Sequence, residues 1–224
     1  MKTLHTVIIL ALAVAIAFVA FNYLSGQNSS SLNELAEVEV RNYNGTNLSS
    51  ILGFRENSIR GTQLVDNTTY RLAIKGLVGN PVNFTYQEVL ALPHYKKVVT
   101  LRCVEGWDVT ILWEGTLIKD LLIQAGLNGS GNTLIFRAND GYSTSLPLDY
   151  VLSNNIIIAS KMNNVTLPPE RGFPFQLVSE SKWGYKWIKW VTEIEVSNDS
   201  YYRGYWESRG YSNVGDLGSG FRGS

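Results

Sequence analysis

Cys103, the only cysteine of the chain, is the first residue whose type and setting point to chemistry. It stands in LRCVEGW, where a predicted strand ends in a glycine-containing loop. Loops at strand ends often carry functional side chains. Beside Arg102, a thiol with a lowered pKa would bind a soft metal ion as thiolate. The alternative is a small buried hydrophobic residue, which is the commoner role of a lone cysteine.

A thiol nucleophile is a further interpretation of Cys103, and it requires a basic partner. The only histidine in the folded part is His94, and nothing in the sequence places it against the thiol. One cysteine excludes an internal disulfide, an iron–sulfur cluster and c-type haem attachment. Two histidines are too few for a histidine-based metal site.

A second candidate stretch runs from Pro168 to Trp190 and is dense in basic residues, glycines and aromatics. Such a mixture suits a loop around a planar, phosphorylated ligand, because lysine and arginine pair with phosphate and aromatic rings stack. The alternative is a strand pair with a solvated basic face. The residues concerned are Arg171, Gly172, Lys182, Trp183, Gly184, Tyr185, Lys186, Trp187 and Lys189.

A third candidate is NDGYSTSLPL, residues 139 to 148. The turn at its start presents Tyr142 and Ser143 near the surface, where a tyrosine hydroxyl can donate to an anion or an oxo group. An ordinary hairpin tyrosine is the alternative.

The elements that must position these residues are short strands and short helices, interleaved without the rhythm of a parallel sheet. The pattern predicts one domain of the α+β class. Predicted strands cover residues 69–78, 97–103, 133–138, 141–146, 156–160, 175–178 and 187–196. Predicted helices cover residues 86–92, capped by Thr85, 117–125 and 147–152.

The N-terminus reads as a membrane anchor over residues 1–24, with a signal sequence as the alternative. Residues 7–21 carry no charge, Lys2 precedes them, and nothing basic follows until Arg41. This asymmetry predicts that the rest of the chain lies on the extracytoplasmic side. We expect a polar spacer and lead-in at 25–56, the main domain at 57–212 and a flexible tail at 213–224.

Composition limits the partners. The chain has 19 basic and 19 acidic residues, so net charge gives no reason to expect nucleic acid. Asn-x-Ser/Thr sites suggest a glycosylated surface, although an Asn- and Ser-rich chain also produces them by accident. The eight sites are at Asn28, Asn44, Asn47, Asn67, Asn83, Asn128, Asn164 and Asn198.

Several blocks in a fixed order resemble the molybdopterin-binding domain of the sulfite oxidase and periplasmic methionine-sulfoxide reductase family. They include VTLRCVEGW, DGYSTSLPL, RGFPFQLV, WGYKWIKW and GYWESRGYSN, and the resemblance covers about residues 57 to 211. The resemblance implies a mixed β-sheet of the sulfite-oxidase type and a molybdopterin cofactor with molybdenum. It also implies an oxygen-atom or two-electron transfer on a small substrate, with a sulfur compound as one candidate.

The resemblance also implies roles for individual residues. Cys103 would be the metal ligand and Tyr142 a hydrogen-bond donor near the oxo group. Arg171 stands where family members carry His or Asn, and we expect it to act as a substrate or phosphate clamp. The chain departs from the family at Gln176, where an arginine is common, and this leaves sulfite in doubt as substrate. The other expected cofactor contacts are Asn57, Ser58, Ile59, Arg60, Lys186, Trp187, Ile188 and Lys189.

An electron-transfer partner follows from the same resemblance. The haem and dimerisation domains of eukaryotic relatives are not among the matched blocks, so we expect a separate electron-transfer protein, either a haem protein or a membrane redox subunit. The alternative function is a cell-surface glycoprotein domain that keeps the fold but has lost cofactor and catalysis.

Overall fold

The computed structural model describes residues 32–223. It divides the chain at residue 38: residues 32–38 are helical and belong to the first part, and a compact unit begins at Glu39. The anchor expected at residues 1–24 lies outside the described residues. Within residues 32–223, no helix has the length and apolar character needed to cross a membrane.

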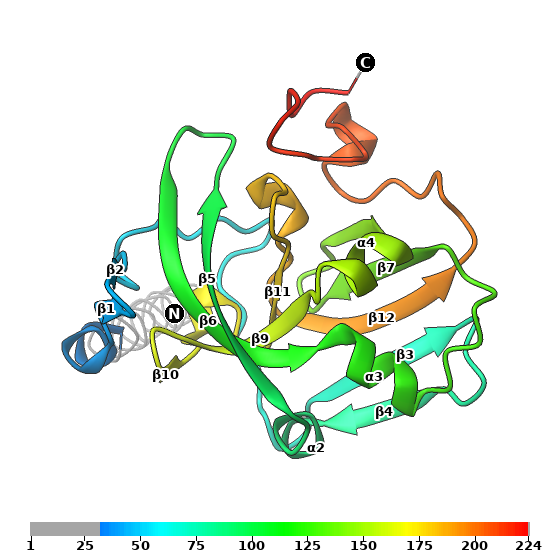
Figure 1. The fold of residues 1–224 in the computed structure, drawn as a ribbon, viewed down its shortest axis with the longest axis horizontal. Helices are drawn as coiled ribbons and strands as arrows, with labels where there is room; N and C mark the ends of the chain where they lie inside the picture. The colour runs from blue at the N-terminus through cyan, green and yellow to red at the C-terminus, as the bar shows by residue number, and fades with distance from the viewer. Residues whose placement is uncertain (1–31, 224) are drawn as a thin grey trace, which may run out of the picture. The chain divides into compact units, whose positions relative to one another are not determined.

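One sheet of the compact unit is built around a long, curved hairpin of β5 and β6 (Figure 1). Its strand order is β10-β9-β6-β5, β11 also pairs with β9, and every pairing is antiparallel. The strands are β5 (His94–Arg102), β6 (Asp108–Leu117), β9 (Ile157–Met162), β10 (Val165–Thr166) and β11 (Gln176–Val178).

The other sheet has the order β4-β3-β12-β7-β8. β12 pairs with β3 in parallel, whereas the remaining pairings are antiparallel, so the expected mixed sheet in an α+β fold is confirmed. The strands are β3 (Arg71–Gly76), β4 (Val82–Thr85), β7 (Thr133–Ala138), β8 (Ser143–Pro147) and β12 (Val191–Ser197). A small hairpin pairs β1 (Asn42–Tyr43) with β2 (Thr46–Asn47).

The helices are short and sit at strand connections. Thr85 caps the first of them through a capping box with Glu88, as its sequence predicts. The α-helices are α2 (Tyr86–Leu90), α3 (Ile118–Gln124) and α4 (Leu148–Ser153). Three 3-10 turns follow, namely η1 (Pro169–Arg171), η2 (Gly184–Lys186) and η3 (Glu207–Arg209).

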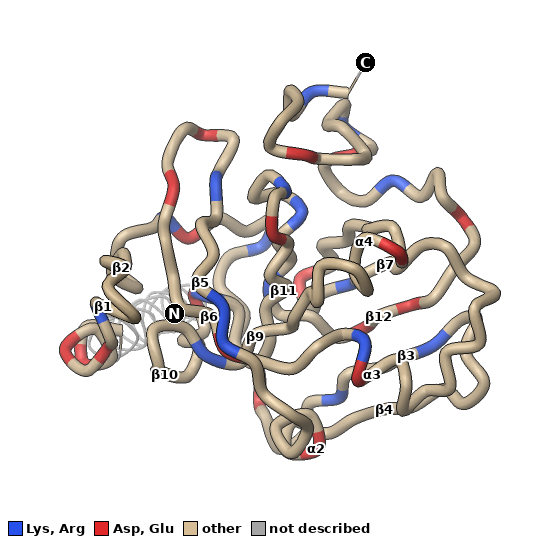
Figure 2. The backbone as a smooth tube through the Cα atoms, viewed as in Figure 1, with Lys and Arg blue, Asp and Glu red and all other residues tan. Residues whose placement is uncertain are grey.

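The hydrophobic core joins both sheets to the helices. Alternate residues of the β3-β12-β7 strands point inward, including Leu72, Phe136 and Ile194, each of which is fully buried. They meet Leu121 of α3 and Ile158 of β9 in the same cluster. The opposite face of this sheet is polar, and Figure 2 shows basic residues on β3 and β7 beside acidic ones on β12.

The structure differs from the sequence prediction at several places, of which three bear on the site or on the domain bounds. β6 was not predicted, because most of its second half is buried and so lacks the alternation of a half-buried strand. β12 begins at Val191 instead of residue 187, since η2 and a left-handed Trp190 (φ 53°) precede it. In the expected tail, Asp216 pairs with Lys182, so that segment packs against the domain.

The expected lead-in is also part of the compact unit. Glu39 is buried and accepts hydrogen bonds from Ser50 Oγ, Ile51 N and Asn163 Nδ2. Ile51 is itself fully buried. These contacts extend the unit to the N-terminal side of residue 57 and bring residues 54–56 to the site described next.

Candidate functional site

A pocket of about 480 Å³ opens at the end of β5 and contains Cys103. The sequence interpretation required Asn57, Tyr142, Arg171 and Lys189 to surround this cysteine, and all four line the same pocket. They come from the loop before β3, the turn before β8, η1 and the segment after η2. The volume lies in the range of small-molecule and cofactor sites.

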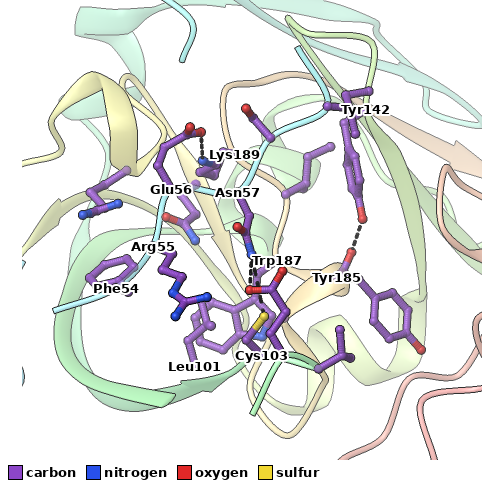
Figure 3. A pocket seen from close by; sticks show the side chains of 18 of the residues that line it. Phe54, Arg55, Glu56, Asn57, Leu101, Cys103, Tyr142, Tyr185, Trp187 and Lys189 are labelled. Atoms are coloured by element: carbon purple, nitrogen blue, oxygen red, sulfur yellow. Dashed lines mark hydrogen bonds and ion pairs between the residues drawn. The ribbon is translucent and has the colours of Figure 1, made fainter. Parts of the chain in front are cut away.

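Cys103 sits directly after β5, in a turn closed by the hydrogen bond from its N–H to Trp107 O at 2.9 Å. Its side chain is partly exposed. Asn57 Nδ2 donates to Cys103 Sγ at 3.8 Å (Figure 3). Behind the thiol, Gly184 approaches closely, because a Cβ built there would lie 3.4 Å from Cys103 Cα. The backbone thus fixes the sulfur at the pocket wall.

Burial raises the pKa of the Cys103 thiol above its usual value. The expectation of a pKa lowered by Arg102 was therefore wrong: Arg102 is exposed, and desolvation is the largest influence on the thiol. Glu105, whose side chain also lines the pocket, accepts hydrogen bonds from Asn57 Nδ2 and Trp107 Nε1 at 3.3 and 3.0 Å. A raised pKa makes a free thiol a weaker nucleophile at neutral pH, and a bound cation would favour its deprotonation.

Arg171 is a buried cation that faces the pocket with unused hydrogen-bonding capacity. Only 5% of the residue is exposed, and its Nε donates to Ile51 O at 3.0 Å. Its guanidinium stacks over the Phe54 ring, 4.2 Å from the centroid. Among the described residues, Nη1 is buried without a hydrogen-bond partner. Burial lowers the pKa of Arg171, because desolvation disfavours its charged form. An anion in the pocket would offset that cost.

Gln176 and Lys189 add an acceptor and a second cation. Gln176 is 2% exposed, and its Oε1 is another buried atom that finds no partner in the part of the chain described. Lys189 Nζ donates to Glu56 Oε1 at 2.8 Å (Figure 3) and to Glu170 O at 3.1 Å. Burial lowers the pKa of Lys189, whereas its hydrogen bond and charge pairing with Glu56 oppose that shift.

Tyr142 lines the pocket, but its hydroxyl is already engaged. It donates to the backbone carbonyl of Tyr185 at 2.5 Å (Figure 3). Burial raises the pKa of Tyr142 well above its usual value, so the hydroxyl stays protonated. Donation from Tyr142 to a ligand would therefore require the hydroxyl to leave the carbonyl of Tyr185.

The structure brings together most of the expected residues. Of those that the resemblance gives as cofactor contacts, Lys186 and Arg60 do not line the pocket. Lys186 is fully buried and pairs with Glu207, and Arg60 is exposed beside Gly141. Lys182 likewise turns to Asp216. The expected residues that line the pocket are Asn57, Ser58, Ile59, Cys103, Tyr142, Arg171, Gln176, Trp187, Ile188 and Lys189.

Sequence reasoning missed several lining residues. Phe54 and Glu56 were assigned to the lead-in, and Glu105 was treated only as a neighbour of the cysteine. The acidic Glu105 could have been noticed from its place in LRCVEGW, whereas no local pattern marks Phe54. The lining residues that were not predicted include Phe54, Arg55, Glu56, Leu101, Glu105, Trp107, Asp140, Glu170, Trp206 and Tyr211.

The site can hold a metal ion at one thiolate and an anionic, hydrogen-bonding group beside it. The thiol supplies a soft ligand. Arg171 Nη1 offers a donor and Gln176 Oε1 an acceptor, and both are buried and unpartnered among residues 32–223. Unsatisfied buried polar atoms are costly, so a ligand that pairs with both fits this pocket.

Comparison with known proteins gives a consistent result. The family described as "oxidoreductase molybdopterin binding domain" matches residues 60–206. The chain is 32% identical over 152 residues to the uncharacterised oxidoreductase YuiH of Bacillus subtilis, covering 67% of this chain and 76% of YuiH. It is 34% identical over 148 residues to a putative protein-methionine-sulfoxide reductase subunit, YedZ1, of Azospira oryzae, covering 66% of this chain and 56% of YedZ1.

A solved structure shares the fold. The sulfane dehydrogenase SoxCD of Paracoccus pantotrophus aligns with a TM-score of 0.61 and 24% sequence identity. The alignment covers 69% of this chain and 43% of that chain.

Proposed function

The chain belongs to the oxidoreductase molybdopterin-binding domain family, and from that premise we propose that it reduces a neutral sulfoxide in an extracytoplasmic compartment. As a member it is a molybdenum-dependent oxidoreductase with a molybdopterin cofactor. The observation that carries the proposal is the Cys103 thiol in one pocket with unpartnered, buried groups of Arg171 and Gln176.

Bound molybdopterin supplies two-electron redox chemistry at molybdenum. We assign Cys103 as the protein ligand of the metal. Burial raises the pKa of its thiol, and a bound metal ion would favour the thiolate that ligates it. Asn57 then stabilises the thiolate, because its side-chain amide donates toward Sγ.

Arg171, Lys189 and Gln176 would hold the cofactor. Arg171 contributes a guanidinium fixed by Ile51 O and the Phe54 ring, so little ordering is needed when an anion binds. Lys189 contributes a cation whose position Glu56 sets. Gln176 contributes an acceptor instead of the family's common arginine, and Arg171 supplies the missing positive charge five residues earlier.

The charges beside Cys103 favour a neutral substrate. The Glu105 carboxylate shares the Asn57 amide with the thiol, which places negative charge next to the metal-binding atom. The cation of Lys189 is balanced by Glu56. A sulfite anion would be repelled by Glu105, whereas a sulfoxide carries no net charge. The name of the Azospira relative, a putative methionine-sulfoxide reductase subunit, agrees with this substrate class.

The proposed reaction breaks the sulfur–oxygen double bond of the sulfoxide. Sulfur is reduced by two electrons to a thioether, and the oxygen leaves as water with two protons. The electrons come from a separate redox protein, either a haem protein or a membrane subunit. The extracytoplasmic location rests on the expected N-terminal anchor and on the sequons, since the seven sequon asparagines within residues 32–223 are all exposed.

The test begins with protein purified from a molybdenum-replete host, followed by metal and pterin analysis. Reduced viologen dye then serves as electron donor, with dimethyl sulfoxide and methyl p-tolyl sulfoxide as acceptors, and sulfite oxidation is measured in parallel. We expect about one molybdenum per chain, sulfoxide reduction and little sulfite oxidation. Cys103→Ser should fold and lose the metal. Folded wild-type protein with no more molybdenum than Cys103→Ser would overturn the proposal.

A cofactor-free surface glycoprotein is the competing function, favoured by the exposed sequons. The pocket speaks against it, because a protein without a ligand gains nothing from an unpaired Arg171 Nη1 and Gln176 Oε1. The metal analysis separates the two functions directly.

A further inference from the structure

A fully buried ion pair, Lys186–Glu207, lies outside the lining of the pocket and has no part in the proposed chemistry. Neither side chain is exposed, and Lys186 Nζ donates to Glu207 Oε1 at 2.6 Å. The same carboxylate oxygen accepts from Thr144 Oγ1 at 2.5 Å, and Lys186 Nζ also donates to Ser145 O at 2.9 Å. Removing one partner of such a pair leaves a buried charge uncompensated.

The pair joins two segments that line the pocket. Lys186 ends η2, and its neighbours Tyr185 and Trp187 both line the pocket. Glu207 begins η3 in the C-terminal part of the chain, directly after Trp206, which lines the pocket from the other segment. Lys186 and Glu207 therefore link η2 to η3 in the protein interior, outside the pocket lining.

The residues around η3 form what we call the aromatic wall, namely Tyr205, Trp206 and Tyr211. The Tyr205 ring lies 5.7 Å from the Tyr142 ring, and the Tyr211 ring lies 5.1 Å from the Tyr185 ring in an edge arrangement. Trp206 and Tyr211 are also 5.1 Å apart. The aromatic wall thus packs against Tyr142 and Tyr185. These two tyrosines are joined by the hydrogen bond from the Tyr142 hydroxyl to the Tyr185 carbonyl.

Gly204 fixes the position of the chain just before the aromatic wall. Tyr205 N donates to Ser143 O at 2.9 Å, and a Cβ on Gly204 would lie 2.2 Å from that same Ser143 oxygen. Only glycine permits this approach to β8. The aromatic wall is therefore held at two points: Gly204 packs on β8 just before Tyr205, and Glu207 pairs with Lys186 between Trp206 and Tyr211.

We propose that Glu207 is a positioning residue, which through Lys186 holds the aromatic wall at the pocket and so selects sulfoxides with an apolar or aromatic arm. The inference rests on the proposed function for its substrate, but the anchoring itself does not. Trp206 and Tyr211 offer ring surface on which such an arm packs, and a small sulfoxide has no arm to place there. Loosening η3 should weaken binding of the larger substrate while leaving the metal site intact.

Glu207→Gln tests the anchoring without activity. Arg209 ends η3, so trypsin should cleave after it at least about tenfold faster in the variant than in the wild type. In the wild-type holoenzyme, the amides of Arg209 and Tyr211, both hydrogen-bonded to Trp206 O, should resist hydrogen exchange. This second measurement needs no variant and stands even if Glu207→Gln does not fold.

Kinetics test the positioning. In Glu207→Gln we expect KM for methyl p-tolyl sulfoxide to rise about tenfold or more, with kcat/KM for dimethyl sulfoxide changed less than about threefold and molybdenum content unchanged. Asp216→Asn is the matched control. Asp216 lies in the C-terminal part of the chain, as Glu207 does, and is a half-exposed partner of Lys182. Its substitution should leave the kinetics with both sulfoxides unchanged.

Three results would overturn the proposal. The first is a trypsin cleavage rate and a KM in Glu207→Gln that equal those of the wild type. The second is an equal rise of KM in Asp216→Asn, and the third is rapid hydrogen exchange of the Arg209 and Tyr211 amides in the wild type. If the wild type reduces neither sulfoxide, the proposed function fails. The cleavage and exchange results still decide whether Glu207 anchors the wall.

Discussion

The side-chain amide of Asn57 donates to Cys103 Sγ at 3.8 Å, although 46 residues separate the two along the chain. The same amide reaches Glu105 Oε2 at 3.3 Å. The loop before β3 therefore closes over the turn after β5 and sets the polarity around the sulfur. Such hydrogen bonds orient a metal ligand and tune its basicity.

Asn57→Leu should weaken molybdenum retention about 10–100-fold, since the thiolate loses its side-chain donor. The fold should persist, because Asn57 is exposed. Molybdenum content after dialysis against a chelator measures the effect. Asn139→Leu is the control, because Asn139 also donates a side-chain amide, to Gln63 Oε1, but does not line the pocket. Equal metal loss in both variants would contradict the prediction.

Arg171→Met should reduce cofactor retention at least about tenfold, because a charge-assisted hydrogen bond to an anion is lost. The cofactor-free protein should be affected little or even stabilised, since a buried cation with an unpartnered Nη1 is removed. Pterin content and urea unfolding measure the two effects. Arg55→Met is the control, as Arg55 lines the same pocket but is exposed. A loss of pterin in Arg55→Met as large as in Arg171→Met would refute this assignment.

Glu114 should stabilise the fold at neutral pH and lose that contribution in acid. Burial raises the pKa of its carboxyl, but Lys161 and Lys96, at 3.3 and 3.4 Å, outweigh burial and hold the pKa below its usual value of 4.5. A depressed folded-state pKa gives stability that is complete above the unfolded-state value and disappears as pH falls through the folded-state value.

Glu114→Gln should therefore lower the free energy of unfolding by about 1 kcal/mol or less at about pH 7, and the difference should vanish near about pH 3. Urea unfolding at both pH values measures it. With Lys96 and Lys161 both replaced by Met, burial of the carboxylate is no longer outweighed, so the same substitution should not destabilise the fold at either pH. A difference that persists in acid would show that the ion pairs are not its source.

Phe136→Ala should destabilise the domain by about 3–5 kcal/mol, through lost burial and the cavity left behind. Phe136 is fully buried in β7, within the cluster that joins both sheets. Tyr201→Ala is the control, since Tyr201 is 87% exposed and should change stability by less than about 0.5 kcal/mol. Chemical denaturation of both variants measures the contrast, and similar stabilities for the two would place the core elsewhere.

The order of local patterns along the chain predicted the fold class, and the resemblance of those ordered blocks to a known family made Cys103 the candidate metal ligand. Alternating strands, the Thr85 cap and the cysteine at a strand end are properties of adjacent residues, and each is present where it was expected. The pocket around Cys103 was predictable for the same reason, since most of its lining lies within blocks that the sequence presents intact.

Tertiary structure alone decided how the polar side chains pair. Lys186 and Lys189 are three residues apart in one basic block, yet Lys186 turns to Glu207 and Lys189 to Glu56. Tyr142 donates to Tyr185 O, 43 residues away, instead of to an open pocket. Local patterns cannot fix such choices, because a buried charge or hydroxyl takes the partner that the packing of distant segments brings within hydrogen-bond reach.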